Sequence, residues 1–317
     1  MGRYILKRLL WMIPVVVGVS IFIFTIMYFV PGNPAELILG TDATRETVEK
    51  LEQEMGLDQP YFVQLVRYLK QVFINFDFGN SYYTKRSVSA ELIARLPRTV
   101  AVGISAMLLT ILIGTPLGIT AAVHQNGPAD RICMVIALLG VSVPTFWLAL
   151  MLVILFSLKL KLLPTTGIGS IKHYIIPVFA QSVGGWGGQA RLARSSMLEE
   201  LRADYVTTAR AKGLTGTEIT YKHALPNALI PIITSAGISL ANIFGGSVVI
   251  ENVFSIPGVG NYMIQAINTR DYPIIEGSVI FLAFIFALCM LLVDLAYAFV
   301  DPRIKAQYES HSRKKRK

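Results

Sequence analysis

The residues whose side chains most often do chemistry are scattered through this sequence. Its two cysteines, Cys133 and Cys289, lie inside apolar runs, and its four histidines are far apart, so neither a disulfide framework nor a zinc site is predicted. No Gly-Lys pair occurs, which excludes a Gly-x-x-x-x-Gly-Lys-Ser/Thr phosphate loop. No nucleophile signature or pair of catalytic acids is evident. The sequence therefore predicts no catalytic residue, metal ion or bound cofactor in this chain.

One stretch in the second half of the chain organises polar, basic and small residues into a pattern. Residues 197–212 have helical spacing, and Gly213 is placed to end that helix. Thr215-x-x-Glu218 is the pattern of a capping box that opens a second short helix, and Pro226 is expected to end it. The pattern predicts two short helices that are joined at a glycine and project from the membrane.

This two-helix stretch has the composition of a docking element. Small residues in its middle let another protein approach the backbone, Arg210 and Lys212 suit an acidic rim, and Leu214 suits an apolar pocket. A connector that rests on the lipid surface has a similar mixture of basic and apolar residues. The residue types alone leave these two interpretations open.

The rest of the sequence predicts the frame that positions this stretch, and that frame is a membrane protein. Of the 317 residues, 53% are apolar and only 15% are charged, whereas a soluble domain has about 25% charged residues. Six runs are long and apolar enough to cross a hydrocarbon core of about 30 Å as helices. They lie near residues 9–30, 99–123, 132–158, 175–193, 228–250 and 278–300. The expected fold class is all-α and polytopic.

The distribution of charge predicts the orientation. Three basic residues precede the first run and a basic tail follows the last one, so six crossings place both ends of the chain in the cytoplasm. Three lysines between residues 159 and 172 go against this rule, but the two ends and the basic loop 194–226 outweigh them. The net charge of +9 is then a topology signal. No aromatic stacking platform accompanies it, so no nucleic-acid partner is expected.

The expected organisation follows from these crossings. It comprises residues 1–30 as cytoplasmic end and first span, 31–97 as an external subdomain, 98–300 as a core with five spans, and 301–317 as the cytoplasmic tail. Residues 44–55 and 61–73 both have amphipathic helical spacing. A small helical subdomain is therefore expected on the outer face of the membrane.

The fifth run carries a narrow polar strip at helical spacing. It is formed by Ser235, Ser239, Asn242 and Gly246. Such a strip suits the lining of a translocation path or tight helix packing, and both remain open. Gly114 and Gly118 form a small-xxx-small pattern that predicts helix packing in the second run. Asp294 is the acid expected inside a span, and pairing with a basic residue near the membrane boundary is favoured over a functional role.

Two short runs of residues carry a resemblance to a known family. Asp-Tyr-Val-Thr-Thr-Ala-Arg-Ala-Lys-Gly-Leu at 204–214 and His-Ala-Leu-Pro-Asn-Ala at 223–228 resemble the EAA loop of binding-protein-dependent ABC importer permeases. More narrowly, the chain resembles the first permease subunit of the dipeptide, oligopeptide and nickel importers. Further matches lie at 31–35, 56–60, 77–79, 257–260 and 270–273. Thr207 and Pro226 stand where relatives often have arginine, which affects the strength of a docking contact more than its kind.

The resemblance implies a type I ABC importer permease of the bacterial inner membrane. It also implies that the permease is not itself an enzyme. It implies that loop 194–226 is a coupling loop that seats in a cytoplasmic ATPase, and that Glu251 belongs to an outer gate. The residues that inherit the coupling role are Asp204, Tyr205, Ala209, Arg210, Ala211, Lys212, Gly213 and Leu214. The implied partners are a second permease subunit, two ATPases that use ATP and Mg²⁺, an external substrate-binding protein and membrane lipid.

The resemblance implies short peptides as the substrate class, with glutathione and nickel or other metal chelates as alternatives. A self-sufficient secondary transporter is a different class of function. It would require an inverted repeat or several charges inside the membrane. Neither feature is evident in the sequence, and a secondary transporter would leave the EAA-like loop unexplained.

Overall fold

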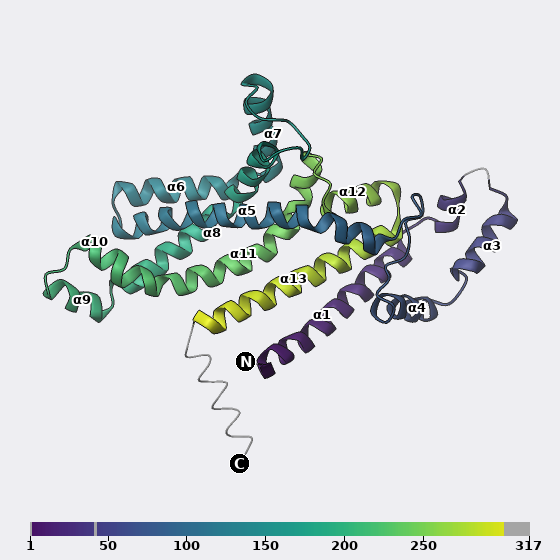
Figure 1. Ribbon diagram of the computed structural model, residues 1–317, viewed down its shortest axis with the longest axis horizontal. Helices are drawn as coiled ribbons and strands as arrows, with labels where there is room; N and C mark the ends of the chain where they lie inside the picture. Colours follow the sequence, from purple (N-terminus) through teal and green to yellow (C-terminus); the bar gives the residue numbers. More distant parts are fainter. Residues whose placement is uncertain (1, 41–42, 301–317) are drawn as a thin grey trace, which may run out of the picture. The chain divides into compact units, whose positions relative to one another are not determined.

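The computed structural model describes the chain over residues 2–40 and 43–300, of which residues 2–5, 7, 236–246, 293–294 and 296–300 are described by their backbone alone. The regular elements of these residues are all helical (Figure 1). They are α1 (Gly2–Phe29), α2 (Pro34–Leu39), α3 (Arg45–Met55), α4 (Tyr61–Phe73), α5 (Val88–Val123), α6 (Pro128–Ser142), α7 (Thr145–Leu152), the π-helix η1 (Val153–Lys159), α8 (Lys172–Leu201), α9 (Asp204–Ala211), α10 (Gly216–Glu218), the π-helix η2 (Ile219–Ala224), α11 (Leu225–Val253), α12 (Val259–Thr269) and α13 (Tyr272–Val300).

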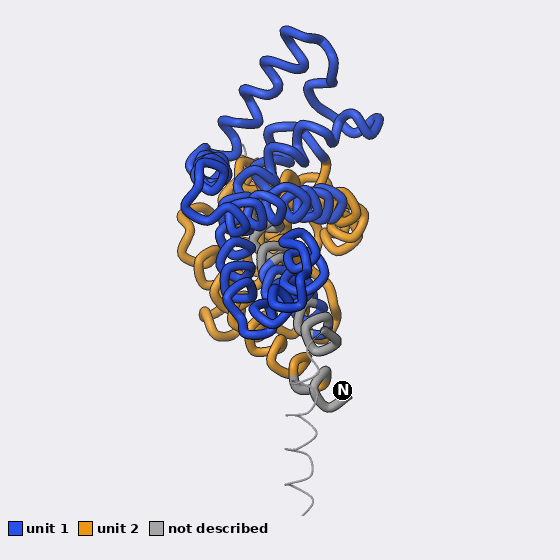
Figure 2. Tube along the Cα trace, turned by 90° about the vertical axis from the view of Figure 1, so that its left-hand side faces the viewer, with its two compact units in different colours: residues 1–5, 100–256, 288–317 blue, residues 6–99, 257–287 orange. Residues whose placement is uncertain are grey.

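The chain forms two compact units, coloured separately in Figure 2. Unit 1 comprises Met1–Ile5, Val100–Ile256 and Leu288–Lys317, and unit 2 comprises Leu6–Thr99 and Pro257–Ala287. The boundaries fall inside α5 and α13, so each of these helices contributes to both units. The two units are defined by compactness, whereas the boundaries expected near residues 30, 97 and 300 are defined by membrane topology. Those boundaries therefore stay predictions.

Helix α8 is the centre of unit 1, where it packs against α6, α7 and α11. Glycines let its backbone come close to the neighbouring helices. A Cβ atom on Gly118 of α5 would lie 2.3 Å from the Ala190 carbonyl oxygen of α8, and one on Gly187 would lie 2.3 Å from a methyl carbon of Val141. Only glycine fits at such distances. The packing role predicted for the small-xxx-small pattern is confirmed.

The third predicted span is wrong as a single helix over 132–158. Helix α6 ends at Ser142, α7 begins at Thr145, and the paired segments Pro128–Ser142 and Thr145–Lys159 bend by 97°. Val143 has an extended backbone (φ −87°, ψ 123°) because Pro144 disfavours helical geometry in the residue that precedes it. The stretch is apolar on both sides of the break, so a prediction of spans from apolar composition does not detect the break.

Three helices of the described part of the chain are long and apolar enough to cross a membrane. They are Arg8–Phe29, Val88–Val123 and Tyr272–Leu292, and the bent pair would make a fourth. Helices α8 and α11 are 30 and 29 residues long and occupy the fourth and fifth predicted spans. Glycine-rich α8 has too little apolar character to pass the same test within the described residues. The total of six crossings therefore stays a prediction.

In unit 2, the two amphipathic helices predicted at 44–55 and 61–73 are confirmed as α3 and α4. Gly56 ends α3 in the left-handed conformation (φ 69°), which glycine adopts without strain. The Gln64 side chain then donates from Nε2 to the carbonyl oxygens of Leu57 and Gln59, at 2.9 and 2.8 Å. These bonds fix the turn that joins the two helices.

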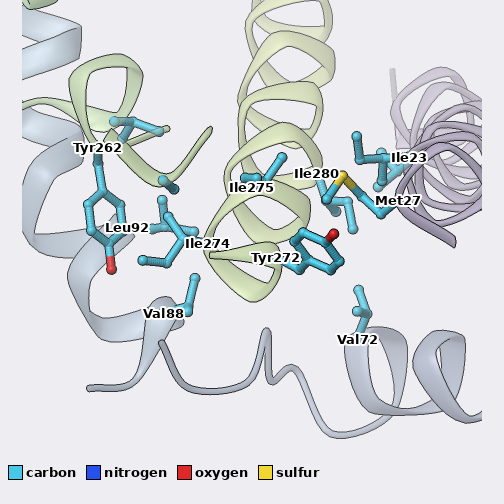
Figure 3. Packing of buried hydrophobic residues seen from close by; sticks show 13 residues of the cluster. Ile23, Met27, Val72, Val88, Leu92, Tyr262, Tyr272, Ile274, Ile275 and Ile280 are labelled. Carbon is cyan, nitrogen blue, oxygen red and sulfur yellow. The ribbon is translucent and has the colours of Figure 1, made fainter. Parts of the chain in front are cut away.

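The core of unit 2 lies between side chains of α1, α4, α5, α12 and α13 (Figure 3). Its buried members include Met27, Val72, Leu92, Tyr262 and Ile280. At its edge, the buried Asp271 accepts hydrogen bonds from the Ser81 hydroxyl (2.6 Å) and the Tyr82 backbone N–H (3.1 Å). Asp271 thereby ties the loop before α5 to the turn between α12 and α13.

Candidate functional site

The loop between α8 and α11 folds as a compact hairpin, and we refer to residues 202–224 as the hairpin. Its first half differs from the prediction of one helix over 197–212. Helix α8 ends at Leu201, Ala203 is extended (φ −70°, ψ 151°), and α9 starts afresh at Asp204. The acidic side chain at this start suits the positive end of a helix. The break changes which side chains point inward.

The turn of the hairpin follows the prediction. Gly213 has φ +80°, and the Leu214 N–H donates to the Ala209 carbonyl oxygen at 3.3 Å. Thr215 and Glu218 form the complete capping box, with the Glu218 N–H donating to Thr215 Oγ1 at 3.3 Å. Hydrogen bonds from the Thr215 N–H and hydroxyl, helped by the Lys222 ammonium, lower the pKa of the Glu218 carboxyl. The start of the second arm is therefore held by reciprocal hydrogen bonds.

The second arm does not end at Pro226, which corrects the prediction. The chain passes from α10 through the π-helix η2 directly into α11, and Leu225 keeps helical angles (φ −57°, ψ −44°). Pro226 lies in the first turn of α11 and has no N–H to donate to the preceding turn, and the change to π-helical geometry in η2 lies directly before it. A local π turn also relieves the crowding that a proline imposes on the residues before it. The arm is thus mechanically continuous with α11.

The hairpin has a small core of its own. Val206, Ala209 and Ile219 are buried against one another, and the half-buried Leu201 and Leu214 pack on them. Ala209 and Leu214, expected as contact residues, therefore support the hairpin from inside. The remaining coupling candidates are exposed, namely Asp204, Tyr205, Arg210, Ala211, Lys212 and Gly213. They form a surface with small residues in the middle and the Arg210 and Lys212 cations beside them.

Tyr205 connects three helices at the base of the hairpin, namely α8, α9 and α11. Its hydroxyl donates to Glu200 Oε2 at the end of α8 (2.5 Å) and accepts from Asn227 Nδ2 in the first turn of α11 (3.2 Å). Partial burial and the hydrogen bond to the Glu200 carboxylate raise the pKa of Tyr205 above its ordinary value. The hydroxyl therefore stays protonated at neutral pH and holds α8, α9 and α11 together.

Two family descriptions match the sequence. Residues 114–306 match the binding-protein-dependent transport system inner membrane component, and residues 1–103 match the N-terminal family of the same membrane component. The chain belongs to this permease family. The permease is therefore a component of a transport system in the inner membrane, with several apolar helices.

Relatives over the whole length support this membership. The dipeptide transport system permease protein DppB of Alkalihalophilus pseudofirmus is 42% identical over 333 residues, covering 96% of the permease and 100% of DppB. The glutathione transport system permease protein GsiC of Salmonella paratyphi A is 40% identical over 305 residues, covering 96% and 99%.

A solved structure supports the fold. The inward-facing MetNI methionine ABC transporter matches with a TM-score of 0.57 at 21% identity, covering 66% of the permease and 96% of that chain. The predicted fold class, an all-α permease of the type I ABC importer kind, is confirmed.

Ser235 is the first residue of the polar strip predicted in the fifth span, and the structure describes its contacts. Ser235 donates to Gln189 Oε1 of α8 (3.3 Å), and the buried Gln189 donates from Nε2 to Thr115 Oγ1 of α5 (3.1 Å). In this conformation Ser235 joins three helices of the permease, as in the packing interpretation. The side chains of Ser239, Asn242 and Asp294 are not described, and Gly246 is described by its backbone alone.

Glu251, expected at an outer gate, is fully buried in the last turn of α11. Its neighbours Ile250 and Phe254 belong to a core cluster that also includes Val102 and Ile176. The structure therefore places Glu251 within the packing of unit 1. Its role in gating stays a prediction.

Sequence reasoning missed an ion pair between α6 and α8, in the bundle that α5, α6, α8 and α11 form. Arg194 of α8 donates two hydrogen bonds to the carboxylate of Asp130 in the first turn of α6, at 2.8 and 2.7 Å, and the Asn126 N–H donates to the same carboxylate at 2.9 Å. Such bidentate geometry is the strong form of an arginine–carboxylate contact. The signal was an acid in the first turn of the helix that begins at Pro128, but its partner lies 64 residues away.

Proposed function

We propose that this chain is the transmembrane permease subunit of an ATP-driven importer of dipeptides or short oligopeptides. In this proposal it forms half of the translocation path beside a second, homologous permease subunit. Two cytoplasmic ATPases hydrolyse ATP with Mg²⁺, and an extracytoplasmic binding protein delivers the substrate. Both ends of the chain lie in the cytoplasm, as the basic residues at each end favour.

The hairpin is the observation that carries the proposal. It has its own core, its turn is fixed by Gly213 and by the Thr215–Glu218 capping box, and it passes without a break into α11. A segment built in this way moves as one body. A push on the exposed side chains between residues 204 and 213 is therefore delivered to the membrane helices and is not absorbed by a flexible loop.

The substrate class rests on the relatives. DppB is named as a dipeptide permease and GsiC as a glutathione permease, and the chain covers nearly all of each. Glutathione is itself a tripeptide, so both names describe small peptides with charged ends. We infer the peptide class, with glutathione as the second candidate.

The test replaces Gly213 by valine in the complete transporter. A β-branched residue is strained in the left-handed conformation that Gly213 adopts, by about 1–2 kcal/mol. We expect uptake of labelled dipeptide or glutathione into proteoliposomes to be abolished, while the subunit remains inserted in the membrane. Peptide-stimulated ATP hydrolysis should be lost in parallel.

Gly216→Ala is the matched control. Gly216 lies three residues further along the same turn, has no left-handed conformation, and a Cβ atom there would meet nothing within 4 Å. This variant should transport normally. Uptake at the wild-type rate in Gly213→Val would refute the coupling role of the hairpin, and uptake of neither peptide by the wild-type protein would refute the substrate class.

A further inference from the structure

Helix α4 of unit 2 has two apolar faces. The inward face carries Tyr61 and Tyr68, which contact aromatic rings of α1, and Val72, which enters the core. The outward face exposes Phe62 (74% exposed) and Val66 (64% exposed), one helical turn apart. A helix that merely covers a core would have polar side chains on this second face.

Helix α3 shows what an ordinary surface helix of the same subdomain looks like. Its core side carries the buried Val48, with Leu51 and Met55 half-buried. Its exposed side chains are charged or polar and include Glu49, Gln53 and Glu54. The apolar exposure of α4 is therefore a property of that helix and not of the whole subdomain.

The contacts of α4 with α1 fix its depth relative to a membrane. The apolar run Arg8–Phe29 of α1 has 22 residues, which gives a length of roughly 33 Å and matches the hydrocarbon core of a bilayer. The Phe24 and Tyr68 rings lie 5.0 Å apart, and the Thr25 hydroxyl lies 2.7 Å from the Tyr61 hydroxyl. Both contacts are made in the last turns of this run. Helix α4 therefore crosses α1 where the span reaches the membrane surface.

A continuous row of rings joins the exposed face of α1 to that of α4. The row runs from Phe29 through Tyr28 and Tyr61 to Phe62, with centroid separations of 5.4, 5.1 and 5.2 Å. Phe29 is itself 74% exposed at the end of the span. Aromatic side chains gather at this level because their rings suit the boundary between headgroups and acyl chains.

We propose that α4 is a membrane-interface anchor, with Phe62 and Val66 inserted into the lipid leaflet at the end of α1. The exposed Lys70, one turn beyond Val66, is placed to reach the headgroups. Ile74 and Phe76, exposed by 66% and 80%, extend the apolar surface beyond the helix. The anchor holds the subdomain of α2, α3 and α4 at a fixed orientation to the bilayer. It depends on the insertion of α1 and is independent of the hairpin.

The test measures the depth of spin labels in the bilayer. Phe62→Cys and Val66→Cys are each labelled with a nitroxide in the full-length chain, after replacement of Cys133 and Cys289 by alanine. The protein and its co-purifying subunits are reconstituted in vesicles of phosphatidylethanolamine and phosphatidylglycerol. Glu49→Cys and Gln53→Cys on α3 are the matched controls.

Oxygen concentrates in the bilayer, whereas a nickel chelate stays in water. We expect oxygen to relax the labels at 62 and 66 more than nickel does, and the reverse at 49 and 53. Greater relaxation by nickel at 62 and 66 would mean that the face is open to water and would overturn the proposal. Protection from both reagents would mean that another protein covers the face, and would overturn it equally.

Discussion

The hairpin and the helices from which it projects are stabilised in opposite ways. In the bundle, α8 meets α5 and α6 through glycines that leave no room for a single extra carbon. In the hairpin, three buried apolar side chains and a set of local hydrogen bonds hold the shape, while most of the side chains are exposed. The difference teaches that substitutions in the bundle should act on folding, whereas substitutions in the hairpin should act on transport.

The largest effect is expected from Gly118→Leu in the bundle. The new side chain would overlap the Ala190 carbonyl oxygen, and overpacking a well-packed interior costs about 1–3 kcal/mol or more. Since 1.4 kcal/mol corresponds to a factor of ten in an equilibrium constant, the ratio of folded to unfolded permease should fall by about tenfold or more. Monodisperse yield after detergent extraction measures it.

Gly188→Ala is the control for this variant, because a Cβ atom at Gly188 of α8 would meet nothing within 4 Å. Its yield should equal that of the wild type. A normal yield for Gly118→Leu would show that the α5–α8 contact is looser than described, and would remove the contrast with the hairpin.

A smaller effect is expected at the junction of the two regions, from the pair Asp130 and Arg194. Asp130→Asn and Arg194→Gln should each lower the melting temperature, and the double variant should lose less than the sum. The coupling free energy in such a double-mutant cycle is about 0.5–3 kcal/mol for residues in contact. Thermal unfolding of the purified complex gives all four values.

Arg131→Gln supplies the control for the pair, since Arg131 is an exposed arginine next to Asp130. Its melting temperature should stay within about 1 °C of the wild type, as surface substitutions usually do. Strict additivity of the two variants of the pair would mean that the ion pair contributes nothing to the stability of the bundle.

The smallest effect on stability, with a clear effect on transport, is expected from Tyr205→Phe. The ring stays, but the hydrogen bonds to Glu200 and Asn227 are lost, each worth about 0.5–1.5 kcal/mol. Uptake should fall by about three- to tenfold with only a small decrease in melting temperature, because the ring and its packing remain, while ATP hydrolysis continues. The ratio of peptide transported to ATP hydrolysed is the measurement.

Tyr221→Phe is the matched control, because Tyr221 is an exposed tyrosine on η2 of the same hairpin. It should leave the transport ratio unchanged. If Tyr205→Phe instead lost stability and kept its transport ratio, the hairpin would resemble the bundle, and Tyr205 would have only a structural role.

Much of this architecture could be predicted from local sequence. The capping box, the left-handed Gly213, the helices α3 and α4, and the packing glycines of α5 all follow from short-range rules. These features depend on residues within about one turn of each other, or on the absence of a side chain. Contacts with residues far away in the sequence therefore have little influence on these features.

The buried face of α9 shows why the rest could not be predicted. A single helix over 197–212 would put Leu201, Tyr205 and Lys212 on one side. The extended Ala203 resets the helical phase, so that Val206 and Ala209 turn inward and Tyr205 turns outward. Val206 and Ala209 pack against Ile219 across the hairpin. The local sequence around residue 203 does not indicate these contacts. The Asp130–Arg194 pair escaped prediction for the same reason.

Helix α8 runs without interruption through 30 residues, from Lys172 to the edge of the hairpin. Its segment 172–189 measures roughly 26 Å and its segment 194–201 roughly 10 Å, at 1.5 Å per residue. Because Gln189 and Arg194 hydrogen-bond to neighbouring helices, they divide α8 into a short arm beside the hairpin and a longer arm on the other side. A tilt of α8 about these two residues would move its far end roughly 2.5 times as far as the end beside the hairpin, because displacement scales with arm length.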